Sequence, residues 1–136
     1  MRLRASGSKR RNIRPQEQAF GRGLLIDSYS FGRVVVDGKA YTRDLIILPD
    51  RVLEGWRRRE GHRVEPADLR EAFAEKLEML IVGTGYYGFM KVPAETSDWV
   101  KSRGVKLVVA KTAEACRTYN SLSRSGKAAA ALHLTC

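Results

Sequence analysis

The chain has 136 residues, of which 25 are Lys or Arg and 15 are Asp or Glu, so its formal net charge is +10. A chain of this length forms one domain with a sizeable hydrophobic core and leaves no room for two full domains. Its apolar runs fall far short of the roughly 18 residues needed to cross a bilayer, and its first residues lack the apolar stretch of a secretory signal. These features favour a cytoplasmic location with no membrane span.

The positive charge is concentrated at the N-terminus. Residues 1–23 contain seven cations and one anion, a net charge of +6, whereas residues 24–136 carry only +4. Because few large apolar side chains accompany this charge, we expect a flexible basic extension followed by a single domain over 24–136. A solvated extension of no specific role, non-specific binding of nucleic acid or another polyanion, and organelle targeting are the alternatives for residues 1–23.

The first part of the domain has the composition of β-strands. β-Branched and aromatic residues dominate 24–37, and the Asp37-Gly38 pair is the strongest short-range signal for a hairpin turn. The apolar run 45–48 indicates a further strand, and an irregular connection is expected over 49–64. The hairpin must be antiparallel.

From residue 65 onward, predicted helices and strands alternate, which is typical of an α/β sheet with parallel neighbours. The expected elements are a helix opening at Glu65-Pro66 with Leu69, Phe73 and Leu77 as its buried stripe, a strand at 79–82, a helix between Pro93 and Gly104, a strand at 105–109, a helix capped by Thr112, and a last strand at 128–134. Together with the N-terminal hairpin, this order predicts a mixed sheet covered by helices.

Two segments contain the residue types of a binding pocket. The glycine-rich loop 83–88 follows a predicted parallel strand, at the sheet edge where α/β folds place ligands. It matches G-x-G-x-x-G, but no helix starts at its third glycine, and the next strand ends at Ala110-Lys111 with no acid placed to bind a ribose hydroxyl, which opposes dinucleotide binding. The segment 56–62 sets an aromatic ring beside several cations. The candidate ligand or partner pocket consists of Trp56, Arg57, His62, Gly83, Thr84, Gly85, Tyr86, Gly88 and Lys91.

Simpler interpretations of both segments stay open. Loop 83–88 can be a turn whose aromatic side chains cover the sheet edge, and segment 56–62 can be a solvated basic loop anchored by its tryptophan. His62 has no matching nucleophile or carboxylate, and Asp44 and Asp50 are interpreted as turn or cap residues. We therefore expect no catalytic residues, no metal and no cofactor, and enzymatic activity stays uncertain, with a non-catalytic role favoured.

Several motifs, in this order, resemble one widespread family, the domain of unknown function shared by the adipogenesis-associated cytoplasmic protein and mitochondrial complex I assembly factor 3. They are Ser28–Gly32, Tyr41–Asp50, Trp56-Arg57 with Gly61-His62, Gly83–Gly85 with Gly88, and Ala131–Cys136. The resemblance covers about residues 24–136. It implies a compact three-layer α/β domain with a central mixed sheet.

The resemblance also implies a function. Its named members look like assembly or regulatory factors that work through protein contacts, so we expect a non-catalytic protein-binding module. The alternative is a binding protein or enzyme for a small anionic metabolite, with its pocket at the Gly83–Gly88 loop. Nucleic-acid binding through residues 1–23 is a weaker third hypothesis.

Overall fold

The computed structural model describes residues 23–74 and 76–136. The flexibility and the binding roles expected of residues 1–23 therefore concern a segment that lies almost wholly outside the described residues. Within the described part of the chain, no helix has the length and apolar character needed to cross a membrane.

The N-terminal strands form a small antiparallel sheet in the order β1-β2-β3. Its members are β1 (Ile26–Ser30), β2 (Arg33–Val36) and β3 (Lys39–Tyr41). Between β2 and β3, Asp37 and Gly38 have φ angles of 47° and 82°. Positive φ at both central residues is what a type I′ turn needs, so the predicted hairpin is confirmed.

A second, mixed sheet of five strands has the order β5-β4-β8-β6-β7. Its members are β4 (Leu45–Ile47), β5 (Val52–Glu54), β6 (Met79–Thr84), β7 (Lys106–Ala110) and β8 (Ala128–His133). β6 pairs parallel with both β7 and β8, whereas β4 pairs antiparallel with β5 and β8. The predicted mixed sheet and its parallel pair are confirmed.

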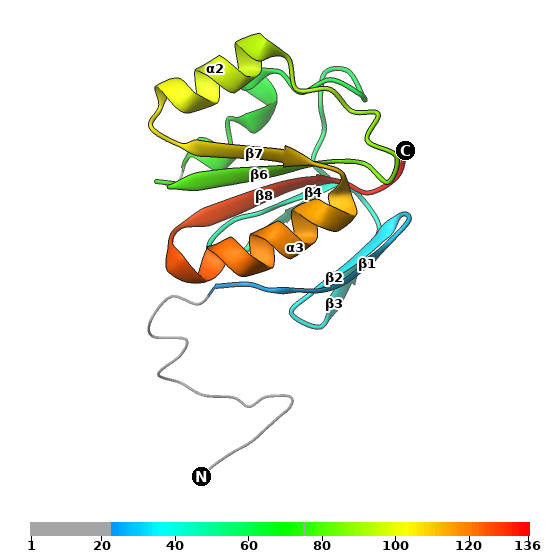
Figure 1. Ribbon diagram of the computed structural model, residues 1–136. Helices are drawn as coiled ribbons and strands as arrows, with labels where there is room; N and C mark the ends of the chain where they lie inside the picture. The colour runs from blue at the N-terminus through cyan, green and yellow to red at the C-terminus, as the bar shows by residue number, and fades with distance from the viewer. Residues whose placement is uncertain (1–22, 75) are drawn as a thin grey trace.

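Both faces of the five-stranded sheet are covered (Figure 1). Helix α2 (Ala94–Ser102) lies on one face, and helix α3 (Thr112–Leu122) with the three-stranded sheet lies on the other. Alternate residues of β4 follow this division, because Leu45 and Ile47 belong to one buried cluster and Ile46 to the other. The domain thus has the expected three layers, with the central sheet between two hydrophobic cores.

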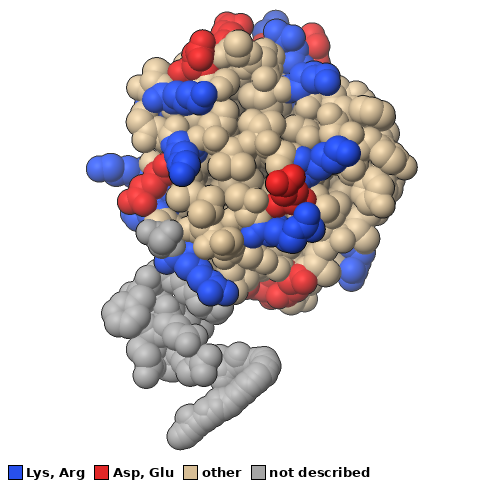
Figure 2. Space-filling model, in the orientation of Figure 1, with Lys and Arg blue, Asp and Glu red and all other residues tan. Residues whose placement is uncertain are grey.

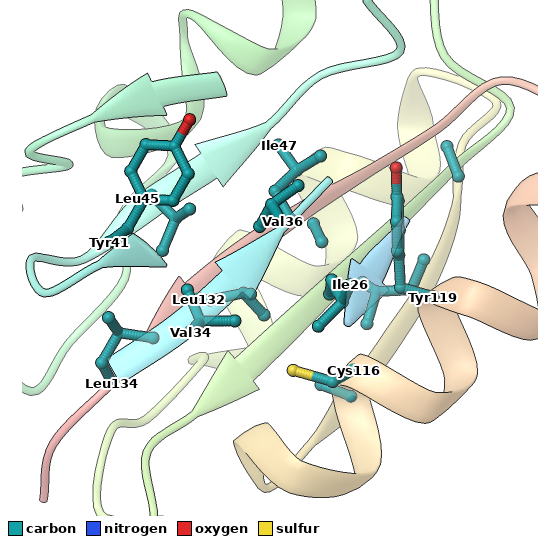
Figure 3. Close-up of a cluster of buried hydrophobic side chains, with 14 residues drawn as sticks. Ile26, Val34, Val36, Tyr41, Leu45, Ile47, Cys116, Tyr119, Leu132 and Leu134 are labelled. Carbon is teal, nitrogen blue, oxygen red and sulfur yellow. The ribbon is translucent and has the colours of Figure 1, made fainter. Parts of the chain in front are cut away.

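The core on the α3 side also fixes the first strand (Figure 3). Asn120 of α3 accepts a hydrogen bond from the backbone N–H of Ile26 and donates one to its carbonyl, at 2.9 and 2.7 Å. The Tyr119 hydroxyl donates to the carbonyl of Leu24. Burial raises the pKa of the neighbouring Cys116 thiol to about 12, so this side chain packs as a small apolar residue.

The segment after Glu65 differs from its prediction. It forms two 3-10 turns, η1 (Pro66–Leu69) and η2 (Ala72–Ala74), where an α-helix was expected. The Asp68 carboxylate accepts hydrogen bonds from the backbone N–H groups of Arg59 and Glu65. The bond from Glu65 belongs to a capping box, which favours a helix start, and the backbone N–H groups that follow donate to carbonyls three residues earlier, the pattern of a 3-10 helix. The predicted helical start at Glu65-Pro66 is confirmed, but one regular helix continuing to Leu77 is not, because the described segment forms two separate 3-10 turns.

Two further details of the sequence prediction are corrected. The connection 49–64 is not wholly irregular, because it contains the edge strand β5 paired with β4. Thr112 does not cap α3: Lys111 holds the N-cap position, and the Thr112 hydroxyl makes long-range contacts instead. It donates to the carbonyl of His133 at 2.6 Å and accepts from the N–H of Gly85 at 2.8 Å.

Candidate functional site

The loop after β6 exposes a group of aromatic rings. Tyr86, Tyr87 and Phe89 are each about half exposed, at 48%, 54% and 55%. Phe31, in the turn between β1 and β2, is 51% exposed and lies 5.6 Å from the Tyr86 ring centroid and 6.3 Å from that of Tyr87. We name Phe31, Tyr86, Tyr87 and Phe89 the aromatic patch.

The rings of the aromatic patch contact one another in sequence. Tyr86 and Tyr87 meet edge to face with centroids 5.0 Å apart, and Tyr87 stacks on Phe89 at 5.7 Å. Tyr29, which is half-buried, approaches Tyr86 at 6.4 Å and continues the group toward the core. These separations are those of favourable aromatic pairs, so the rings support one another's positions.

Backbone contacts hold the patch in place. The Tyr86 N–H donates to the carbonyl of Thr135, and the Gly32 N–H donates to that of Leu134. Buried Met90 closes the loop by donating its N–H to the carbonyl of Thr84. The patch therefore rests on the carboxyl end of β6 and on Leu134 and Thr135, the two residues that follow β8.

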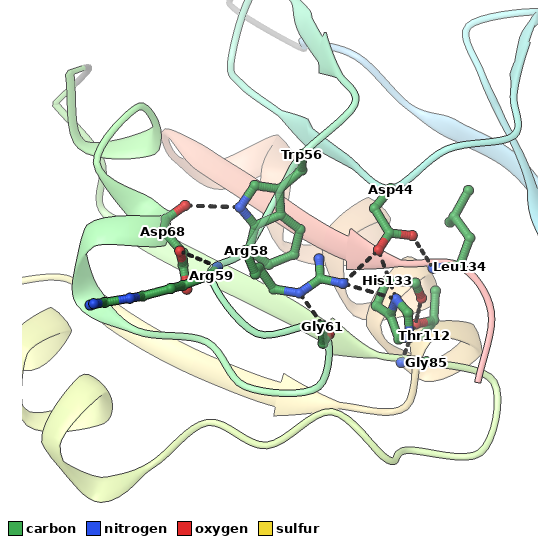
Figure 4. A network of polar contacts seen from close by, with 10 residues as sticks. All are labelled: Asp44, Trp56, Arg58, Arg59, Gly61, Asp68, Gly85, Thr112, His133 and Leu134. Carbon is green, nitrogen blue, oxygen red and sulfur yellow. Dashed lines mark hydrogen bonds and ion pairs between the residues drawn. The ribbon is translucent and has the colours of Figure 1, made fainter.

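A buried polar network lies at the same edge of the sheet (Figure 4). The Asp44 carboxylate accepts hydrogen bonds from Arg58 at 2.8 Å, from His133 Nδ1 at 2.7 Å and from the Leu134 N–H at 2.8 Å. The side chains of Arg58, His133 and Asp44 are only 5%, 8% and 17% exposed. The network joins the start of β4, the loop after β5 and the end of β8.

Arg58 is also held by its own loop. Its Nε donates to the carbonyl of Gly61 at 2.9 Å, and its guanidinium lies 4.5 Å from the Trp56 ring centroid. The Trp56 indole N–H in turn donates to the carbonyl of Asp68. Within the described residues, buried Arg58 Nη1 and His133 Nε2 have no hydrogen-bond partner. These two buried nitrogen atoms are exceptions to the rule that buried polar atoms make hydrogen bonds.

Two opposing effects act on the pKa of Asp44. Burial favours the neutral acid, but the hydrogen bonds from His133, the Leu134 N–H and Arg58 favour the carboxylate more strongly. The pKa of Asp44 is therefore lowered from its ordinary value. The folded protein holds this carboxylate in its ionised form.

The lowered pKa of Asp44 predicts a pH dependence of stability. The ionised carboxylate contributes stability above the unfolded-state pKa of about 4, and this contribution is lost as the pH falls through the lower folded-state pKa. We expect the stability difference between wild type and Asp44→Asn to be largest near neutral pH and to shrink below about pH 4. Urea unfolding of both proteins over this range measures it, and a difference independent of pH would contradict the assignment.

Some of the predicted pocket residues are buried or hydrogen-bonded within the fold, and others are exposed. Trp56 is buried, with its indole N–H bonded as described, whereas Arg57 and His62 are exposed. The His62 ring lies 5.5 Å from the His133 ring, which places it over the polar network. The Thr84 hydroxyl donates to a backbone carbonyl of β7 at 3.2 Å.

The rest of the predicted pocket lies in the loop beside it. Gly83 and Gly85 are buried, Gly88 has a φ of 80°, and Tyr86 and Lys91 are exposed. The Lys91 N–H donates to the carbonyl of His62 at 2.8 Å, so segments 56–62 and 83–91 lie side by side. The pocket itself stays a prediction.

Sequence reasoning missed the partnership of Asp44, Arg58 and His133. The sequence favours a turn or cap role for Asp44, but its carboxylate is the centre of the network, with hydrogen bonds from Arg58, His133 and Leu134. Arg58 was one of three consecutive arginines with nothing to distinguish it. The sequence places Asp44 directly before one apolar strand and His133 at the end of another. Nothing in these two positions indicates that the side chains contact each other.

The described residues contain no arrangement of three or more His, Cys, Asp or Glu side chains that could hold a metal ion. Cys116 is buried and Cys136 is exposed, and both are free thiols. β8 ends at His133, so Cys136 lies beyond this strand.

Comparison with known proteins gives matches of three kinds. A model of a family described as "Protein of unknown function (DUF498/DUF598)" matches residues 26–133. A curated relative from Danio rerio, NADH dehydrogenase (ubiquinone) 1 alpha subcomplex assembly factor 3, is 31% identical over 111 residues. That match covers 80% of this chain and 63% of the relative, so the chain spans less than two thirds of the relative's length.

Solved structures share the fold. A crystal structure of a conserved hypothetical protein from Pyrococcus horikoshii has a TM-score of 0.70 and 28% identity, covering 82% of this chain and 98% of that one. An NMR structure from Xanthomonas campestris has a TM-score of 0.67 and 20% identity, covering 82% and 84%. With the family model matching most of its length, this chain belongs to the family of proteins of unknown function DUF498/DUF598.

Proposed function

We propose that this protein is a non-catalytic assembly or regulatory factor that binds another protein through the aromatic patch. The observation that carries the proposal is the exposure of four contiguous rings, each close to half, on a backbone fixed by the ends of β6 and β8. Contiguous exposed apolar surface of this kind is typical of an interaction site.

The chemistry of the patch suits a protein partner. Aromatic side chains are enriched in the centres of protein interfaces, where they bury large areas at little cost in conformational entropy. The two tyrosine hydroxyls add hydrogen-bonding capacity to an otherwise apolar surface. Since the backbone under the rings is already ordered, binding need not order a loop, and this favours affinity.

The relative from Danio rerio supports an assembly role, because its name describes an assembly factor. The present chain resembles it at 31% identity over 111 residues. We propose the general role of an assembly factor for this chain, and we do not propose the relative's partner for it. We propose no reaction, because the network of Asp44, Arg58 and His133 has its side chains turned to internal contacts.

The other hypotheses from the sequence stay as predictions. Arg57, His62 and Lys91 are exposed on adjacent segments, and this is the observation that favours a small anion as an alternative ligand. The hypothesis of nucleic-acid binding concerns residues 1–23. It does not extend to the face of the molecule seen in Figure 2, because the described cations there are dispersed among acidic and uncharged residues. A cytoplasmic location likewise stays a prediction.

Variants of the aromatic patch test the proposed function. Tyr87→Ser with Phe89→Ser should leave the fold intact, because both side chains are about half exposed, and should reduce recovery of the partner by about tenfold or more. The measurement is affinity capture of the full chain from its native cell with identification by mass spectrometry. Val109→Ser is the matched control, because Val109 is 46% exposed but lies on β7. Equal recovery by the double variant and the control would refute the role of the patch.

A further inference from the structure

A groove lies on the α2 face of the domain and shares no residue with the aromatic patch. It runs between the segment of η1 and η2 and the C-terminal half of α2, with a volume of about 520 Å³. The half-buried rings of Phe73 and Trp99 form its apolar wall, with their centroids 4.9 Å apart. This volume is enough for a few side chains of a bound peptide.

Two arginines are the charged residues that line the groove. Arg70 and Arg103 are both exposed, and neither makes an ion pair with any residue of the described ranges 23–74 and 76–136. The guanidinium of Arg103 lies 4.3 Å from the Trp99 ring centroid. Stacking on Trp99 orients the planar guanidinium while its N–H donors stay available for a carboxylate.

We propose that this groove binds an acidic peptide segment of a protein partner, with an apolar side chain against Phe73 and Trp99 and carboxylates on Arg70 and Arg103. The two arginines favour a ligand with carboxylates. The apolar wall favours a peptide that also has an apolar side chain near its acidic residues. The chain's own residues 1–22, with seven cations and one anion, have the wrong charge for this groove.

The stacking of the rings favours a peptide over a nucleic acid. Bases bind single-strand sites by stacking on free aromatic faces. In this groove the Arg103 guanidinium lies over the Trp99 ring, and Phe73 packs against it at an interplanar angle of 52°, so the pair offers an apolar wall and not the free aromatic face that base stacking needs. A carboxylate needs only the outer edge of the guanidinium, which this arrangement leaves accessible.

The test uses a display library of random peptides selected against the full chain, followed by affinity measurement of the enriched peptides. The proposal predicts enriched sequences that combine acidic residues with an aromatic or aliphatic one. It further predicts that Arg70→Gln and Arg103→Gln each weaken binding by about tenfold and that raised salt weakens it too. Lys101→Gln is the matched control, since Lys101 is an exposed cation on α2 that does not line the groove, and binding should stay within about twofold.

Several results would overturn the proposal. Enriched peptides without acidic residues, or affinities that Arg103→Gln leaves unchanged, would exclude the groove as an acidic-peptide site. Binding lost in Tyr87→Ser with Phe89→Ser but kept in Arg103→Gln would assign the peptides to the aromatic patch instead. An oligonucleotide that binds through Arg103 where peptides do not would make the groove a nucleic-acid site. Self-association abolished by Arg103→Gln would make the occupant a second copy of the chain.

Discussion

Asp44→Ala is expected to lower the free energy of unfolding by about 3–5 kcal/mol, the usual cost of removing one partner from a buried ion pair. Three donors converge on the Asp44 carboxylate, and the side chain of one of them, Arg58, is only 5% exposed. Without the carboxylate, the Arg58 guanidinium stays buried with its charge uncompensated. Urea unfolding at neutral pH measures the loss.

A double variant separates two contributions to the lost free energy of unfolding: the buried charge left without a partner, and the loss of packing. Asp44→Ala combined with Arg58→Met should be less destabilised than the sum of the two single variants, because no charge is then left alone. Asp50→Ala is the control: Asp50 pairs with Arg51 at 3.0 Å, but its side chain is 69% exposed, and its loss should cost no more than about 1 kcal/mol. If Asp44→Ala cost as little as Asp50→Ala, the network would not be the structural centre of this sheet edge.

Gly85→Ala is expected to cost about 2–5 kcal/mol, because strain and overlap act together at this position. Gly85 has a φ of 106°, which residues with a side chain rarely adopt. An added Cβ would lie 2.7 Å from the carbonyl oxygen of Thr135 and 2.9 Å from Cδ2 of His133. The variant should also disturb the aromatic patch, since the Tyr86 N–H donates to that same carbonyl.

Gly104→Ala separates these two causes. Gly104 has a φ of 75°, and no heavy atom beyond its own chain neighbours lies within 4 Å of a Cβ added there, so only the backbone strain of about 1–2 kcal/mol applies. Thermal and urea unfolding of both variants give the comparison. Equal losses would mean that the end of β8 moves aside freely and that the sheet edge under the patch is not rigid.

Local sequence signals predicted the elements that depend on near neighbours. The Asp37-Gly38 turn, the parallel pairing of β6 with β7 and the mixed sheet were all found from turn chemistry and alternating composition. Gly104 likewise marked the end of the α2 segment, and its φ of 75° explains why. The turn and the end of α2 depend on residues within one or two elements, where sequence patterns carry the most information, whereas the mixed sheet follows from the order of strands and helices along the chain.

Sequence patterns could not predict which residues far apart in the chain contact each other. The Asp68 carboxylate accepts a hydrogen bond from the backbone N–H of Arg59, nine residues away, a contact that no local pattern indicates. Asp44 and His133 are separated by 89 residues, and Arg58 was indistinguishable from its neighbouring arginines. The exposure of Phe31 beside Tyr87 also depends on how the two sheets pack, although loop 83–88 itself was recognised.

Site-specific cross-linking from the aromatic patch tests the central claim most directly. A photoreactive phenylalanine analogue is placed at Tyr87 in one protein and at Val109, also exposed, in a second, and both are irradiated in the native cell. The proposed function predicts a discrete protein adduct from position 87 that is absent from position 109 and that disappears when Phe89→Ser is added. No adduct from position 87, or the same adducts from both positions, would contradict a docking role for the aromatic patch.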